Sequence, residues 1–221
     1  DGQIQKYYFD MHGFDFDLYS VKHDGKKYCL VEYDKTSENR KELYELIDVY
    51  QGKLNDIGER KNALSVTYLS KRSADLDFLK QVKNNLYNYF QNIAKAKRGE
   101  VYYSTLKEIE KPIQPKGYKE PRQKKGEEKK PPQTVIPHNA RATNLYSDKR
   151  AMAYILNRYM NQDIKVFFQD NGVSINDDVY AVGELLQWIY RSRIRNGEPV
   201  ELYLPSSRMR QLLKDWSEYK L

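Results

Sequence analysis

The fold is decided by residues 176–216, NDDVYAVGELLQWIYRSRIRNGEPVELYLPSSRMRQLLKDW. Asn176 or Asp177 caps a predicted helix that runs to about Arg195, because apolar side chains recur there at helical spacing. A predicted strand, residues 200–204, follows this helix. A last predicted helix comes after the strand, and its inner face carries the apolar side chains Met209, Leu212, Leu213 and Trp216.

The same alternation continues toward the N-terminus. Residues 151–156, AMAYIL, predict a strand, and residues 163–169 predict a helix that Asn171-Gly172 ends. Shorter predicted strands lie at residues 134–136 and 100–104. Because strands and helices alternate along the chain, we predict an α/β fold with a mostly parallel sheet flanked by helices.

The first part of the chain has a different pattern. Residues 16–33 alternate in side-chain type about a central Asp-Gly turn, which predicts a β-hairpin. Residues 6–9 predict another short strand, and residues 38–52 predict a helix. We therefore divide the chain into a region of hairpin and helix, residues 1–62, and a sheet domain, residues 63–221.

A second long helix is predicted near the start of the sheet domain. The segment Ser73-Ala74-Asp75 can cap it, and it ends near Gly99, where two basic side chains precede the glycine. Its apolar stripe consists of Leu76, Leu79, Val82, Leu86, Phe90 and Ile93.

Positive charge is concentrated in one segment. The chain has 221 residues and a net charge of +7, and residues 111–150 hold eleven lysines and arginines against four acids. Residues 111–137 also hold six of the eight prolines, which predicts a long exposed loop. A basic segment on a neutral body favours a polyanion such as nucleic acid as partner. The alternative is a solvated loop without a partner.

Several classes of protein are excluded by composition. No apolar run approaches the roughly 18 residues that span a membrane, so we predict no membrane partner. The single cysteine, Cys29, cannot form an internal disulfide, which suits a reducing compartment. With one cysteine and three histidines we also predict no metal-binding residues. Most of the 20 tyrosines are predicted to pack in the core, with stacking on nucleic-acid bases as the alternative.

The helix predicted to end near Arg195 carries a polar stripe as well. Gln187, Arg191 and Arg195 follow one another at a spacing of four, which places them along one helix face, whereas Arg193 points elsewhere. One glutamine and two arginines in a row offer forked donors to a polyphosphate. The spacing alone does not exclude two alternatives: the stripe is a solvated basic face, or its arginines pair with acidic side chains.

Residues 64–216 resemble the second, C-terminal RecA-like domain of superfamily-2 helicases of the phage and plasmid type. The resemblance covers roughly two thirds of the chain and rests on the order of its pieces. The matching stretches are NNLYNYF at 84–90, NARATNLY at 139–146, AYILNR at 153–158, QWIYRS at 187–192 and YLPSSRMR at 203–210.

The resemblance implies roles for two sets of residues. The polar stripe resembles the motif that supplies arginine fingers, which makes Gln187, Arg191 and Arg195 the candidate catalytic residues. The family places its second arginine where this chain has Ile194, so which arginine touches phosphate stays open. The predicted nucleic-acid contacts are Asn139, Arg141, Thr143 and Asn144, from a turn that resembles the coupling motif, and Lys124, Lys125, Lys129 and Lys130, from the basic segment.

This chain lacks the phosphate-binding half of such a motor. It has no G-x-x-x-x-G-K-[ST] loop and no Asp-Glu pair after an apolar strand to hold Mg²⁺. ATP and Mg²⁺ are therefore expected only if a P-loop RecA-like domain completes the site, in cis or in trans.

We predict the C-terminal half of a nucleic-acid-dependent ATPase or helicase, acting on single- or double-stranded nucleic acid. The expected location is the cytoplasm of a bacterium or of a phage-infected host. One alternative is a non-enzymatic nucleic-acid-binding or replication-accessory module. Another is a protein-interaction module in which the basic loop is inert.

Overall fold

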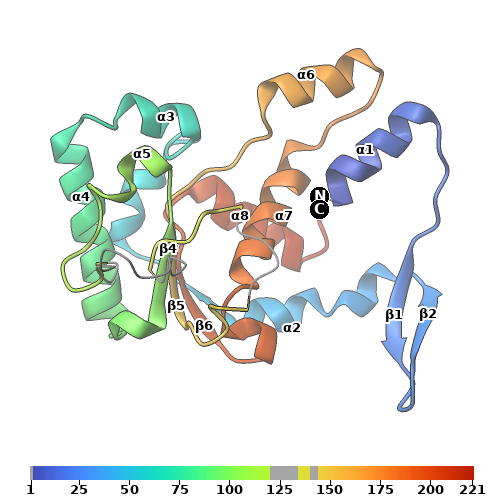
Figure 1. The fold of residues 1–221 in the computed structure, drawn as a ribbon, viewed down its shortest axis with the longest axis horizontal. Coiled ribbons are helices and arrows are strands. Elements are labelled where there is room, and N and C mark those ends of the chain that lie inside the picture. Colours follow the sequence, from blue (N-terminus) through green and yellow to red (C-terminus); the bar gives the residue numbers. More distant parts are fainter. Residues whose placement is uncertain (1, 120–133, 140–143) are drawn as a thin grey trace, which may run out of the picture.

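A four-stranded parallel sheet forms the centre of the molecule (Figure 1). The computed structural model describes residues 2–119, 134–139 and 144–221. Every neighbouring pair in the sheet is parallel, which confirms the predicted α/β class. The strands lie in the order β3 (Ile47–Val49), β6 (Val200–Tyr203), β5 (Ala151–Tyr154) and β4 (Val101–Ser104). The predicted strand at residues 134–136 contributes a single bridge, between Tyr103 and Val135.

Strands β4 and β5 are buried on both faces. Every residue of β4 and β5 is buried, which is why their sequences read as unbroken apolar runs rather than alternating ones. Tyrosines supply much of this core, as predicted: Tyr102, Tyr154 and Tyr203 are all inaccessible to solvent. Burial raises the pKa of each of these hydroxyls, so all three stay neutral.

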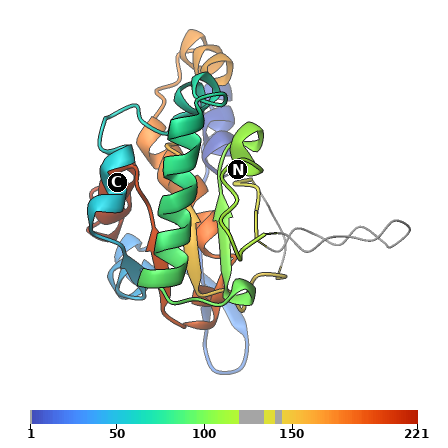
Figure 2. The same ribbon diagram turned by 90° about the vertical axis from the view of Figure 1, so that its left-hand side faces the viewer.

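Long helices cover the two faces of the sheet. α4 (Leu76–Asn88) lies over one face and α7 (Asp177–Ile189) over the other (Figures 1 and 2). The predicted cap of α4 is confirmed, because the Asp75 carboxylate accepts a hydrogen bond from the Phe78 amide at 3.0 Å. A π-helical turn, Tyr89–Ile93, extends α4 at its C-terminal end.

The helix predicted to run to Arg195 ends sooner. α7 stops at Ile189, and a separate 3-10 helix covers Arg193–Asn196. The buried hydroxyl of Ser192 causes the break, since it donates to the Ile189 carbonyl at 2.7 Å and accepts from the Ile194 amide. The prediction of one continuous helix was therefore wrong at this end.

The other two helices of the C-terminal half agree with expectation. α6 (Gln162–Asp170) begins at an Asn161 cap, and α8 (Ser207–Ser217) begins at a Ser206 cap. The predicted inner face of α8 is buried at Met209, Leu212 and Leu213, with Trp216 half-buried. Two short helices, α3 (Val66–Lys71) and α5 (Lys107–Glu110), lie earlier in the chain.

In the N-terminal region the predicted hairpin is confirmed, but a predicted strand is not. β1 (Tyr19–His23) and β2 (Tyr28–Glu32) pair antiparallel, which confirms the hairpin. Residues 6–9, predicted as a strand, lie inside helix α1 (Gly2–His12). That prediction was wrong because Tyr7 packs into a second small core, with Phe168 of α6 as a partner at 5.6 Å between ring centroids.

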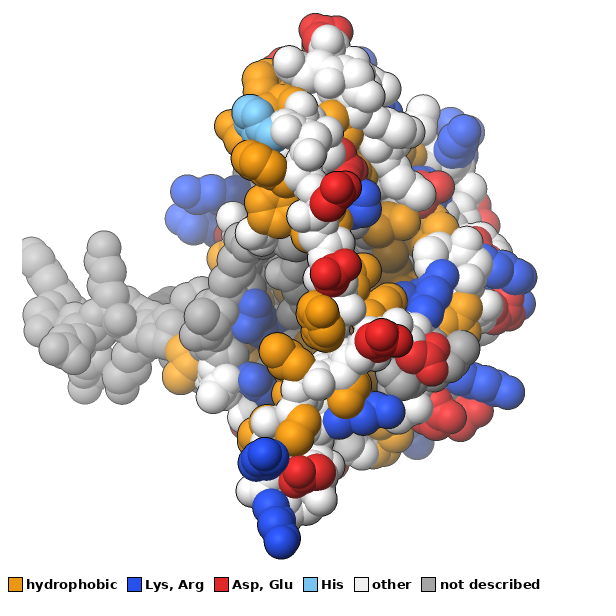
Figure 3. Space-filling view, turned by 90° about the vertical axis from the view of Figure 1, so that its right-hand side faces the viewer, with side chains coloured by type: hydrophobic (Ala, Val, Ile, Leu, Met, Phe, Trp, Pro, Cys, Tyr) orange, Lys and Arg blue, Asp and Glu red, His pale blue; other side chains and the backbone are white. Residues whose placement is uncertain are grey.

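The hairpin presents apolar side chains to solvent. Tyr19, Val21, Tyr28 and Leu30 are each more than half exposed. Figure 3 shows hydrophobic side chains gathered on this side of the molecule. They share one face, because Val21 pairs with Leu30 and the other two stand two positions away on the same strands.

The stretch predicted as one helix at residues 38–52 divides in two. α2 (Arg40–Glu45) is helical, and β3 follows it as an edge strand paired with β6. A strand of three residues is too short to show an alternating pattern in the sequence, so it could not be predicted from the sequence. Its formation depends on pairing with β6. Part of the region predicted as residues 1–62 thus belongs to the sheet.

Two absences concern the described residues only. Within them, no helix has the length and apolar character needed to cross a bilayer. Across the same ranges, no three His, Cys, Asp or Glu side chains gather closely enough to hold a metal ion.

A close backbone contact makes Gly58 sensitive to substitution. A Cβ at Gly58 would lie 2.1 Å from the Pro205 carbonyl oxygen, whereas one at Gly99 would meet nothing within 4 Å. We expect Gly58→Ala to lower the free energy of unfolding by about 1–3 kcal/mol, because backbone cannot yield as a side chain can. Gly99→Ala, the matched control, should leave it unchanged or slightly raised. Urea denaturation measures both, and equal midpoints would contradict the contact.

Candidate functional site

Two of the predicted site segments meet at the amino edge of the sheet, where the strands begin. The Arg195 guanidinium donates a hydrogen bond to the Asn144 side-chain oxygen, across 51 residues of sequence. The Arg193 amide donates to the Lys149 carbonyl at 3.1 Å, which holds the two segments together. The turn that contains Asn144 and the segment that contains Arg195 therefore form one local surface.

Gln187 and Arg191 lie differently from their expected places on one helix face. Gln187 is exposed on α7, but Arg191 follows the end of that helix and is half-buried. The Arg191 Nε atom is buried and has no hydrogen-bond partner among the described residues. Its charge acts on the buried Tyr102 hydroxyl and opposes the rise in pKa that burial produces there. Arg191 thus keeps donor capacity beside the core.

Arg193 is held in internal contacts. Its Nε donates to the Pro199 carbonyl at 2.6 Å, and its guanidinium lies 3.9 Å from the Glu198 carboxylate. Arg193 and Arg195 therefore have different partners, since Arg195 reaches Asn144. Arg193 acts as a local tether for the turn that leads into β6.

The remaining predicted nucleic-acid contacts divide into two groups. Asn139 and Asn144 are both exposed. Six others lie outside the described residues, namely Arg141, Thr143, Lys124, Lys125, Lys129 and Lys130.

Sequence reasoning missed a pocket of about 960 Å³ at the opposite, carboxyl edge of the sheet. It opens beyond the end of β5, the place where parallel α/β sheets usually bind ligands. The polar lining includes Ser65, Lys71, Asn157, Arg158, Lys165 and Tyr180. The available signal was the Asn-Arg pair directly after an apolar strand.

Most cations of this carboxyl-edge pocket already have acidic partners. Lys165 pairs with Asp177, and the Arg158 guanidinium lies 3.7 Å from the buried Glu184 carboxylate. Arg158 also donates to the Tyr180 hydroxyl at 3.3 Å. The pocket therefore offers amides, hydroxyls and aromatic rings more than surplus positive charge.

His138 is a half-buried residue in the described segment 134–139. Burial, and secondarily the nearby Arg158 charge, lower its pKa to about 4. His138 is therefore neutral at pH 7, and it is too weak a base at that pH to serve as a general base.

The sequence itself matches a known family over most of the sheet domain. Residues 41–217 match the family described as the YonV C-terminal Rossmann-like domain. The chain belongs to this family. The match begins within α2 and ends at the last residue of α8, so it includes every strand of the parallel sheet.

One curated relative of this YonV-type domain extends well beyond it. The chain is 40% identical over 220 residues to the SPbeta prophage-derived uncharacterized protein YonV of Bacillus subtilis (strain 168). That match covers 99% of this chain and 50% of YonV, so the chain spans about half the length of this relative. No solved structure matches the chain.

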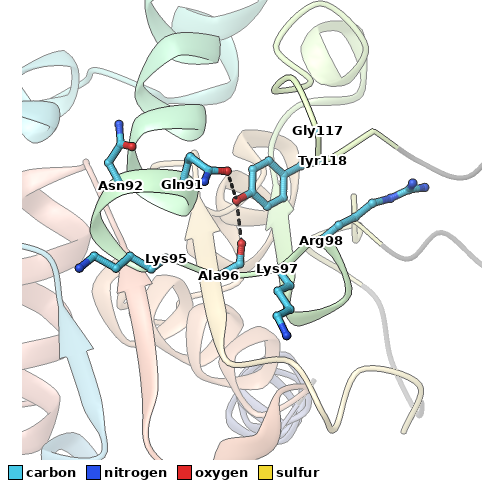
Figure 4. A pocket seen from close by; sticks show the side chains of 8 residues that line it. All are labelled: Gln91, Asn92, Lys95, Ala96, Lys97, Arg98, Gly117 and Tyr118. Carbon is cyan, nitrogen blue, oxygen red and sulfur yellow. Dashed lines mark hydrogen bonds between the residues drawn. The ribbon is translucent and has the colours of Figure 1, made fainter.

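A second hollow of this YonV-type domain lies beside the end of α4. Its volume is about 660 Å³, and its lining comprises Gln91, Asn92, Lys95, Ala96, Lys97, Arg98, Gly117 and Tyr118 (Figure 4). In the sequence, these cations had been interpreted only as favourable charges at the end of a helix. The structure brings them together with Tyr118, which belongs to the predicted loop.

Proposed function

We propose that this domain is the C-terminal half of a nucleic-acid-dependent ATPase of the helicase type. In this proposal, Arg191 and Arg195 act on the phosphates of a nucleotide that a separate P-loop RecA-like domain holds. The observation that carries it is the hydrogen bond between Arg195 and Asn144. It joins the two segments that the helicase resemblance names independently, one for the nucleotide and one for the nucleic acid.

The arginines suit this role chemically. A guanidinium is planar, always charged and able to donate two parallel hydrogen bonds to phosphate oxygens. The buried, unpaired Nε of Arg191 supports the proposal, because a buried donor without a partner costs roughly 1–3 kcal/mol and an incoming anion would relieve that cost. ATP and Mg²⁺ would supply the transferable phosphoryl group and its charge neutralisation when the P-loop domain holds them.

The length of the relative is compatible with a two-part motor. YonV has as much chain again outside the matched half, which is room for a second domain of the same size. We place the phosphate-binding loop in such a partner domain, joined in one polypeptide or supplied in trans. The family described for this chain is itself a C-terminal domain.

The test compares the isolated chain with the two-part protein. The purified chain should not hydrolyse ATP, with or without single-stranded nucleic acid, because it lacks a phosphate-binding loop. The protein completed by its P-loop half should hydrolyse ATP, and nucleic acid should raise the rate. Phosphate release in a coupled assay measures both. Turnover that co-purifies with the isolated chain would refute the proposal.

A non-enzymatic nucleic-acid-binding module is the second candidate. The basic character of residues 111–150 favours it, since that segment alone carries the net charge of the chain. The same assay separates the two candidates. A completed protein that binds nucleic acid but never hydrolyses ATP would favour the binding module.

A further inference from the structure

Residues 78–99, which comprise most of α4 and the turn after it, are free of acids. This stretch holds five cations, Lys80, Lys83, Lys95, Lys97 and Arg98. Leu79, Val82 and Leu86 bury the opposite side of the helix against the sheet. Four of the five cations are exposed and Lys83 is half-exposed, so the stretch that follows Asp77, the exposed acid in the first turn of α4, presents only positive charge to solvent.

Within the described residues, none of these five cations forms an ion pair with a carboxylate. Glu100, the first acid after them, is already engaged: its carboxylate accepts from the Lys97 amide at 2.8 Å and from Arg150 at 3.2 Å. The C-terminal end of a helix carries about half a negative charge. Three full positive charges beside it outweigh that contribution.

The hollow at the end of α4 has a floor held by hydrogen bonds and a rim of long cationic side chains. The Tyr118 hydroxyl donates to the Ala96 carbonyl at 2.7 Å and lies 3.3 Å from the Gln91 side-chain oxygen. Figure 4 shows Lys95, Lys97 and Arg98 extending outward in different directions around this floor. Long cationic side chains spread along a rim suit a chain of phosphates better than a single enclosed anion.

An exposed aromatic ring stands next to this rim. Tyr87 lies on α4 one turn before Gln91, and its side chain is 39% exposed. Residues four apart on a helix are neighbours on its surface, so the Tyr87 ring lies next to Gln91, which lines the hollow. Single-strand-binding proteins combine a positive groove for the backbone with aromatic rings on which bases stack.

We propose that the outer face of α4 and this hollow bind single-stranded nucleic acid, with backbone phosphates on Lys95, Lys97 and Arg98 and a base stacked on Tyr87. A duplex hides its base faces, so the ring favours a single strand. This surface lies on residues that the nucleotide role of Arg191 and Arg195 does not use. This proposal rests on the proposed function, because it names a binding surface for the nucleic acid. Binding at this surface can nevertheless be tested separately from ATP hydrolysis.

The first test changes the charge of the rim. The variant Lys95→Gln/Lys97→Gln/Arg98→Gln is compared with Lys22→Gln/Lys26→Gln/Lys27→Gln, which removes the same charge from the exposed hairpin. The probe is fluorescein-labelled oligothymidylate, measured by anisotropy with the isolated chain across a series of salt concentrations. The rim variant should reduce the slope of log K against log salt by about 2, since each single-strand phosphate contact contributes about 0.7. Equal changes in the two variants would overturn the proposal.

The second test removes the ring. Tyr87→Ala should weaken oligothymidylate binding about 10-fold, because stacking on one base contributes roughly 1–3 kcal/mol, whereas Tyr87→Phe should bind normally. Tyr28→Ala, on the exposed hairpin, is the matched control and should bind normally. Thermal melting checks that each variant is folded. Loss of binding in Tyr87→Phe together with Tyr87→Ala would contradict stacking.

Two further probes define what the surface recognises. A duplex of the same length should bind more weakly than the single strand and should not respond to Tyr87→Ala. Polyglutamate should bind no better to the wild-type chain than to the rim variant. A polyglutamate affinity that only the rim variant loses would overturn the proposal in favour of an acidic protein partner. All these assays omit ATP, so their failure is distinguishable from failure of the proposed ATPase function.

Discussion

Arg191→Ala and Arg195→Ala should each lower the kcat of ATP hydrolysis by about 10³-fold in a protein completed by its P-loop half, as loss of an arginine finger does elsewhere. The affinity for ATP should change much less. A finger interacts mainly with charge that develops on the transferring phosphoryl group, so its removal affects the transition state more than the bound nucleotide. Steady-state hydrolysis with saturating single strand gives kcat, and nucleotide titration gives the affinity.

Arg193→Ala is the matched control for these two variants. Arg193 contacts Pro199 and Glu198 within its own turn, so its loss should leave kcat close to wild type. Arg191→Lys should not restore the rate, because an ammonium lacks the planar fork of a guanidinium. If Arg193→Ala proves the most damaging and Arg191→Ala is near wild type, the assignment of the phosphate-contacting arginines is wrong.

Trp188→Ala should have the largest effect on stability among simple truncations, about 3–4 kcal/mol in the free energy of unfolding. The indole is 1% exposed and packs edge-on against two sheet tyrosines, Tyr102 at 4.6 Å and Tyr154 at 4.9 Å between ring centroids. Its Nε1 atom has no hydrogen-bond partner among the described residues. Removing that buried donor offsets part of the loss, which places the expected value below the upper end for such truncations.

Trp216→Ala makes the same chemical change at a half-buried position on α8 and serves as the control. Its loss should cost less, because a side chain that is partly solvated leaves a smaller cavity. Urea denaturation monitored by circular dichroism gives both free energies. Equal losses for the two tryptophans would show that α7 is not held to the sheet by Trp188 as described.

Elements with strong local signals could be predicted closely. Asp75 and Asn176 are the caps among the residues proposed for their two helices, and Ser206 caps the last helix, because a cap depends on residues only two or three apart. The hairpin could also be predicted from neighbouring residues, because the Asp24 carboxylate accepts hydrogen bonds from the amides of Lys26 and Lys27 within the turn. Local chemistry of this kind is fully visible in a sequence.

Elements that depend on distant partners could not be predicted. Residues 6–9 contain aromatic side chains that favour a strand, yet Tyr7 is helical because its ring fills a core formed with α6. β3 exists because β6 offers it backbone partners. The end of α7 was misplaced because the continuous pattern of polar residues did not reveal that Ser192 would be buried and would turn the chain.

The same distinction applies to the candidate sites. The sequence by itself determined which residue types were available: an arginine-rich segment, an asparagine-containing turn, and a net positive charge confined to residues 111–150. Only the tertiary structure decided which of them meet. It joined Arg195 to Asn144 across 51 residues, tied Arg193 to its own turn, and placed Tyr118 beside the cations that follow α4. The physical reason is that side-chain chemistry is carried by each residue, whereas proximity is set by the packing of a parallel sheet, whose neighbouring strands come from distant parts of the chain.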